Sequence, residues 1–289
     1  MKRESYFRFN YDNDYFAAAD RNYTQGYQLE IASPFLEKNP INSLFLKPKS
    51  GENLYGLAIE HIGFTPYDYV SKEIQLGGRP FAAAIMLKSF LVAKDTINSS
   101  RLTSSLSLGI IGPGAFGGEM HRGIHEATGN KIPQGWRNQI KNDVVLNYQL
   151  GYEKQVIRYA DFFSLQGQSE INLGTLFTNA SVGANATLGF INNGFSSVKK
   201  KRNFQLYIFA QPRLRLVGYD ASLQGGLFNN KSVYTISSSD IKRLTGQFNF
   251  GLILQTKNLY FEYTRTSLTP EFDGGEAANW GGIKIGFTF

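Results

Sequence analysis

The sequence predicts an all-β fold, a twelve-stranded antiparallel transmembrane β-barrel with a short helical insert in one extracellular loop. Segments of about ten residues alternate between apolar and polar side chains along the whole chain. The composition includes 23 Phe, 16 Tyr and 30 Gly, as expected for many strands joined by tight turns. The last segment is amphipathic and ends on Phe289, which resembles the terminal strand of an outer-membrane barrel.

Twelve segments qualify as strands, and an even number brings both ends of a closed barrel to the same side. The alternation is clearest in residues 23–32 (YTQGYQLEIA) and 53–64 (NLYGLAIEHIGF). A soluble sandwich whose last strand happens to be aromatic is the alternative. In chain order, the candidate strands are 4–11, 23–32, 53–64, 80–93, 101–111, 143–157, 161–174, 176–191, 203–217, 246–255, 258–268 and 280–289.

The chain is expected to form a single barrel domain over residues 1–289. No linker divides it, and no repeat of roughly 20–50 residues is visible. Two long connections, 34–52 and 218–240, are too short to separate domains. A third connection, at about 113–142, contains the helical insert.

The composition excludes several classes of protein. No stretch reaches the roughly 18 apolar residues of a membrane-spanning helix. The absence of Cys excludes disulfides and thiolate metal sites, and it is compatible with an oxidising compartment. The net charge of +7 is scattered except for residues 199–202, which we interpret as a solvated turn, so no nucleic-acid partner is expected. The start, MKRESYFRFNYD, has no apolar signal core, so either a signal peptide was removed or the chain is not exported.

Three polar loops are expected at one rim of the barrel. They follow the first, third and fifth strands and comprise residues 12–22, 65–79 and 112–142. Because consecutive antiparallel strands alternate in direction, these three loops emerge on the same side. That rim is the expected location of a functional site.

Two of the three histidines lie in the helical insert. His121 and His125 are four residues apart and therefore share one helix face, and Gly129-Asn130 provides a stop signal. Three interpretations remain open at this point. In the first interpretation, both imidazoles bind zinc, although the HExxH order is absent. In the second interpretation, His125 alone activates a water molecule as a general base. The third is an ordinary surface helix.

Oxygen donors cluster in the first of these loops. Asp12, Asn13 and Asp14 form a run that is followed by Asp20 and Thr24. Such a set suits a hard cation such as calcium. An Asx-rich turn that caps a hairpin has the same composition, and the later glutamate of an EF-hand is missing.

Four motifs resemble, in the same order, those of the outer-membrane lipid A 3'-O-deacylase family. Individually each motif is short. Together they span the first half of the chain and are followed by barrel strands to the C-terminus, which makes the match specific. The motifs are Asn13-Asp14, residues 20–26 (DRNYTQG), residues 78–82 (GRPFA), and Gly112-Pro113 with His125 and residues 135–139 (GWRNQ).

The resemblance implies an enzyme of the bacterial outer membrane that removes the 3'-linked acyloxyacyl chain of lipid A. Its chemistry would be similar to that of calcium-dependent phospholipase A2, with His125 as the general base for water. Asn13 and Thr24 would complete the catalytic set, and Asn13 and Asp14 would hold calcium, the implied cofactor. A bound cation offsets the charge that develops on the carbonyl oxygen of the ester.

The chain departs from the family pattern near two of these motifs. Two glycines precede Arg79 where the family more often has an acidic residue, and Phe81 replaces a tyrosine. In some members an acidic residue follows the histidine by a few positions, whereas Glu126 comes directly after His125. The resemblance therefore leaves the full calcium shell open.

Lipid A carries phosphates, so an enzyme that acts on it needs cations at the outer rim. Lys72, Arg79 and Arg137 are the expected substrate-binding residues, and ordinary solvated loop charge is the alternative for each. The rim segments contain Lys72, Arg79, Arg122, Lys131 and Arg137.

Other functions remain open from the sequence. In a passive outer-membrane pore or adhesin barrel, the insert would merely plug or decorate the rim. No G-x-S-x-G motif is present, so water is a more plausible nucleophile than serine. Glu126 or Gln139 is the expected partner that orients His125, and Trp136 lies either at the membrane interface or beneath the helix. A monomer is expected, because a single chain of this size closes a barrel.

Overall fold

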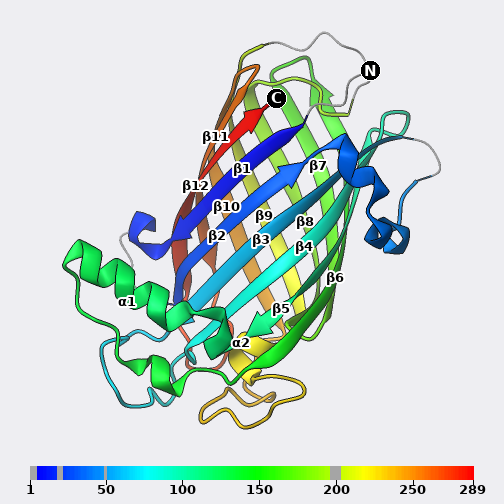
Figure 1. The fold of residues 1–289 in the computed structure, drawn as a ribbon. Coiled ribbons are helices and arrows are strands. Elements are labelled where there is room, and N and C mark those ends of the chain that lie inside the picture. The colour runs from blue at the N-terminus through cyan, green and yellow to red at the C-terminus, as the bar shows by residue number, and fades with distance from the viewer. Residues whose placement is uncertain (1–4, 18–21, 49–50, 196–202) are drawn as a thin grey trace.

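The computed structural model describes residues 5–17, 22–48, 51–195 and 203–289. Asp20 and the basic run 199–202 lie outside these residues, as does the side chain of Thr24. Twelve antiparallel strands pair in chain order, and β1 pairs with β12 to close the barrel (Figure 1). The predicted twelve-stranded barrel is therefore confirmed, and the soluble sandwich is excluded. Both termini lie at the same end (Figure 1).

The expected strands agree with the observed ones to within a few residues. The strands are β1 (Tyr6–Asn13), β2 (Asn22–Ala32), β3 (Glu52–Thr65), β4 (Ala82–Asp95), β5 (Ser100–Ile111), β6 (Asp143–Tyr159), β7 (Phe163–Gly174), β8 (Phe177–Phe190), β9 (Gln205–Asp220), β10 (Leu244–Gln255), β11 (Leu259–Leu268) and β12 (Ala278–Thr288). The helices are η1 (Asp14–Ala17), η2 (Pro34–Lys38), η3 (Pro40–Leu44), η4 (Pro113–Ala115), α1 (Gly117–Thr128), η5 (Gly135–Asn138) and α2 (Ala221–Gln224).

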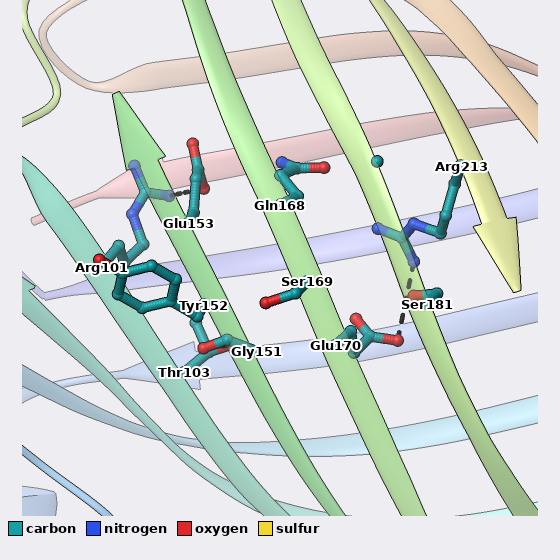
Figure 2. Close-up of a pocket in the computed structure, with 11 residues that line it drawn as sticks. Arg101, Thr103, Gly151, Tyr152, Glu153, Gln168, Ser169, Glu170, Ser181 and Arg213 are labelled. Atoms are coloured by element: carbon teal, nitrogen blue, oxygen red, sulfur yellow. Dashed lines mark hydrogen bonds and ion pairs between the residues drawn. The ribbon is translucent and has the colours of Figure 1, made fainter. Parts of the chain in front are cut away.

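Strand alternation sorts the side chains into a polar interior and an apolar exterior. Inside the barrel, Arg101 pairs with Glu153 at 3.8 Å and Arg213 pairs with Glu170 at 3.6 Å. These two pairs line an interior cavity of about 90 Å³ (Figure 2). On the outer face, the strand register aligns an exposed apolar row across five neighbouring strands. The row consists of Phe9, Leu29, Ile59, Leu87 and Leu108.

Among the residues that the structure describes, no helix is both long enough and apolar enough to span a membrane.

Replacing Ile59 with arginine is expected to destabilise the barrel in a bilayer by about 2–4 kcal/mol. Ile59 is 47 % exposed on the outer face, so the substitution places a charge against lipid. Urea unfolding in liposomes measures the change, and Ile59→Met is the apolar control. An unchanged urea midpoint for Ile59→Arg would contradict the lipid-facing position of this row.

Two connections fold back over the outer wall of the barrel. Near the end that holds the termini, Phe45 from the β2–β3 connection packs on Tyr55, Leu91 and Ala93. At the opposite end, the β5–β6 connection carries α1, which lies beside the barrel wall and not within the barrel (Figure 1). The helical insert therefore neither plugs the lumen nor stands free above it.

Other loops close over the barrel mouth at the end where α1 lies. Tyr234, from the β9–β10 connection, accepts a hydrogen bond from the Gly77 amide at 2.9 Å and donates to the Gly78 carbonyl at 2.9 Å. The Lys141 amide donates to the Ser232 hydroxyl at 3.0 Å. Beneath these loops lies a mixed polar and apolar cavity of about 330 Å³.

Candidate active site

Small residues allow α1 to lie close to the barrel wall. A Cβ atom on Gly117 would come within 2.3 Å of the Ala83 side chain, and one on Gly118 within 3.1 Å of Trp136. The helix ends at Gly129, which has a φ of +71° and is followed by Asn130, whose amide donates to the His125 carbonyl at 2.9 Å. The predicted stop signal is therefore confirmed.

The two histidines of α1 belong to a continuous chain of hydrogen bonds. The Trp136 indole N–H donates to Nδ1 of His121 at 3.0 Å. The Nε2 atoms of His121 and His125 are 2.9 Å apart, and Nδ1 of His125 is 2.6 Å from the Lys131 carbonyl. An indole N–H can only donate and a carbonyl can only accept. His121 is therefore protonated on Nε2, His125 is protonated on Nδ1, and Nε2 of His125 is the acceptor between them.

This arrangement bears on two of the three interpretations of the histidine pair, the surface helix and the zinc pair. His121 is 1 % exposed and His125 is 8 % exposed, so α1 is not an ordinary surface helix with solvated histidines. The proton that Trp136 fixes on Nε2 of His121 occupies the position that a metal ion would need. The geometry therefore does not fit a zinc ion held by these two nitrogens, and the role of His125 as a general base stays a prediction.

The structure corrects one expectation about this helix and decides between the two stated positions of Trp136. The Lys131 carbonyl orients the His125 ring, so the expectation that Glu126 or Gln139 does so is wrong. Trp136 is buried in an apolar cluster with Phe81 and Ala83, so it is the packing anchor and not a membrane-interface residue. The sequence contains no signal for the Lys131 carbonyl, because a backbone acceptor can come from any residue type.

Burial lowers the pKa of His121 to about 3, and the proximity of His125 adds to this effect. The charged form of an imidazole loses its hydration in such a site, so the neutral form is favoured. His121 is therefore neutral over the whole physiological range of pH.

Acidification is expected to loosen α1 locally. The pKa of His121 is about 3 in the folded site and 6.5 when the ring is solvated. The stability that this group contributes is full above about pH 6.5 and falls by about 1.4 kcal/mol per pH unit as the pH drops toward 3. Hydrogen exchange of the α1 amides at pH 7 and pH 5, corrected for intrinsic rates, measures the loss. His121→Gln should show a smaller loss, and equal protection of the wild type at both values would contradict a buried neutral His121.

Asn13 of the first loop lies on the same outer face of the wall as the insert. Asn13 donates to the Tyr11 hydroxyl at 3.1 Å, and the strand register places Tyr11, Tyr27 and His61 in one row across β1, β2 and β3. His61 is buried, stacks on Tyr27 and contacts the Ala115 carbonyl at 2.9 Å, just before α1 begins. The segment that leads into α1 therefore covers the row next to Asn13.

The expected calcium donors begin the first loop. Asn13 accepts a hydrogen bond from the Tyr15 amide at 2.8 Å, which is an Asx turn. Asp14 starts η1, and the residue is only 3 % exposed. A buried carboxylate and a neighbouring amide are thus present, and the calcium role of Asn13 and Asp14 stays a prediction, as does the catalytic role of Thr24.

The three expected substrate-binding cations occupy two different environments. Arg137 is 59 % exposed, and its Nε donates to the Lys72 carbonyl at 3.2 Å, so these two residues lie together at the outer rim. Arg79 is buried: it pairs with Glu271, donates to Ser222 at 2.7 Å and stacks on Phe64. Substrate binding stays a prediction for all three, and the structure adds an internal role for Arg79.

Arg79 ties together loops that are far apart in the sequence. It lies in the β3–β4 connection, Ser222 lies in α2, and Glu271 lies in the β11–β12 connection. Sequence analysis missed Ser222 and Glu271 because their role arises only when these connections meet over the barrel mouth. The buried guanidinium of Arg79 therefore holds three connections of the rim together.

The chain matches one family model and is similar to several solved structures. The family model described as outer membrane protein LpxR matches residues 1–289. The solved structure of LpxR from Salmonella typhimurium has a TM-score of 0.81 and 20 % sequence identity, and the match covers 98 % of this chain and 100 % of that chain. The β domain of the Bordetella autotransporter Brka has a TM-score of 0.47 and 9 % identity, covering 100 % of this chain and 99 % of that chain. No curated protein matches the chain in sequence. The closed barrel and the match of the family model over the full chain show that this protein belongs to the LpxR family of bacterial outer-membrane proteins.

Proposed function

We propose that this protein is an outer-membrane ester hydrolase that removes the 3'-linked acyloxyacyl chain of lipid A. Membership of the LpxR family supports a lipid A deacylase at the family level. The observation that carries the chemistry is the fixed ring of His125, whose Nδ1–H is held by the Lys131 carbonyl. Nε2 is then the basic atom, as a general base requires.

His125 takes a proton from water in the proposed reaction. The O–H bond of water breaks, the proton moves to Nε2 of His125, and the hydroxide attacks the ester carbonyl carbon. When the tetrahedral intermediate collapses, the bond to the sugar oxygen breaks and the proton returns from Nε2 to that oxygen. The products are the released acid and a free sugar hydroxyl.

The position of α1 supports a lipid substrate. The buried histidines contact Trp136 and Tyr69, and Trp136 packs with Ala83 of the outer wall. The exposed apolar row that includes Ile59 and Leu87 follows along the same wall. The ester of a lipid in the outer leaflet approaches the barrel from this side. A soluble substrate that enters through the lumen would instead meet the loops that Arg79 and Tyr234 tie over the mouth.

We propose calcium as the cofactor, held by Asp14 and Asn13 near Thr24. The buried Asp14 carboxylate and the Asn13 amide oxygen are hard donors of the kind that calcium prefers. When bound, the ion would offset the charge on the ester carbonyl oxygen. Asn13 would orient the ester through its amide, and Lys72 and Arg137 would meet lipid A phosphates at the rim.

Mass spectrometry of purified lipid A incubated with the protein in detergent tests the proposal. We expect loss of one 3'-linked acyloxyacyl mass with calcium and no loss with a chelator. Asp14→Asn should raise the calcium concentration needed for activity, and it should weaken the calcium-induced rise in unfolding temperature, which is a readout without catalysis. Unchanged lipid A in every reaction, with a folded barrel, would refute the deacylase and favour the passive barrel. Light scattering in detergent checks the expected monomer.

A further inference from the structure

The basic atom of His125 is already occupied in this structure. Its Nε2 accepts the Nε2–H of His121 at 2.9 Å, so the lone pair that would activate water points at a neighbouring side chain. The other nitrogen of His121 is also engaged, because it accepts the Trp136 indole N–H at 3.0 Å. The pair is thus in a closed state with respect to water.

We infer that His121 is a positioning residue that latches His125: it holds the neutral base in one tautomer and releases it when water and the ester enter the site. This inference rests on the proposed function of His125 as the base. The latch has one donor, Nε2–H of His121, and one acceptor, Nε2 of His125. The substrate water must replace that donor before proton transfer can begin.

The tautomer of His121 is set from outside the pair. Trp136 is buried, and its Cβ and Cγ atoms lie about 3.1 Å from the Cβ that Gly118 would carry, so the helix packs directly on this residue. Because its indole N–H can only donate, Nδ1 of His121 must stay unprotonated and the proton must stay on Nε2. Trp136 therefore keeps the donor of the latch pointed at His125.

The closed latch has room for a single proton between the two Nε2 atoms. A proton on Nε2 of His125 would face the proton on Nε2 of His121, and two donors repel each other. The titratable groups that the structure places against His125 are His121 on the same helix and Tyr69, whose ring centre is 5.2 Å from that of His125. Lys131 contributes its backbone carbonyl. Opening the latch is therefore linked to the proton transfer itself.

A pair of substitutions separates the latch from a merely structural role. In His121→Gln, the amide oxygen can accept from Trp136 and the amide N–H can donate to His125, so both hydrogen bonds survive. His121→Leu removes both bonds and leaves the base without the donor that favours its neutral form. The acid limb of the pH profile of kcat/KM should then move upward by about 0.5 to 1 unit in His121→Leu and stay in place in His121→Gln. A structural defect alone would lower the rate without moving the limb.

Nitrogen-15 NMR spectra of histidine-labelled protein in detergent show which ring nitrogen of each histidine carries a proton, and they need no catalysis. The chain has only three histidines, so the rings can be assigned with single substitutions. We expect His121 to be protonated on Nε2 and His125 on Nδ1, and the Nε2 signal of His125 to shift in His121→Leu and in Trp136→Phe.

Lipid A hydrolysis with its pH profile and the nitrogen-15 spectra together distinguish a failure of the proposed function from a failure of the latch. The expected tautomers together with lipid A that stays intact would overturn the proposed function and leave the hydrogen-bonded pair in place. Active hydrolysis with the opposite tautomers, or with an acid limb that does not move in His121→Leu, would overturn the latch. Active hydrolysis with the expected tautomers and the shifted limb supports both.

Discussion

Replacing His125 with glutamine is expected to reduce lipid A hydrolysis by about 10²- to 10⁴-fold. Glutamine is similar in length to histidine and can still donate to the Lys131 carbonyl, which accepts from His125 at 2.6 Å. It has no nitrogen that takes up a proton near neutral pH, so water loses its base. The loss should therefore appear in kcat and not in the binding of lipid A.

Initial rates of acyl release in detergent measure this effect, with heat-modifiable gel mobility as the check that the barrel has folded. Thr128→Ala is the matched control, because Thr128 is exposed at the end of the same helix and its hydroxyl bonds to the Ile124 carbonyl and the Asn130 side chain, away from the imidazole pair. Full activity of His125→Gln would exclude His125 as the base. A similar loss in Thr128→Ala would show that the helix and not the imidazole is at fault.

Replacing Arg79 with alanine is expected to loosen the loops over the barrel mouth by roughly 3–5 kcal/mol. The Arg79 side chain is 1 % exposed and holds Glu271 and Ser222 in place. Without the guanidinium, the Glu271 carboxylate would be left partly buried and uncompensated. Arg79→Lys should rescue little, because one ammonium group cannot bridge both partners and stack on Phe64 as well.

Limited proteolysis of the folded barrel measures this loosening through cleavage within residues 221–243. Arg137→Ala is the matched control: its ion pair with Glu73 at 3.8 Å is exposed, and such pairs contribute about 0–1 kcal/mol. Cleavage should increase in Arg79→Ala and remain unchanged in Arg137→Ala. Equal resistance of wild type and Arg79→Ala would show that the buried ion pair does not hold the rim.

The sequence by itself determined the class of fold and the set of residues in which the site is expected. Apolar and polar residues alternate within each strand, and this local pattern does not depend on the conformation of the loops. The strand boundaries agree less closely, because the alternation predicts the first strand at 4–11 and it lies at Tyr6–Asn13. The spacing of His121 and His125 predicted a shared helix face for the same local reason.

Only the tertiary structure decided where these residues are used. Arg79 and Glu271 are 192 positions apart, and no local pattern predicts that their side chains meet inside the rim. The latch on His125 depends on Trp136, which is 15 residues from His121, and on a backbone carbonyl that any residue could supply. Local periodicity depends only on neighbouring residues, whereas burial and hydrogen-bond partners depend on which distant segments the closed barrel brings together.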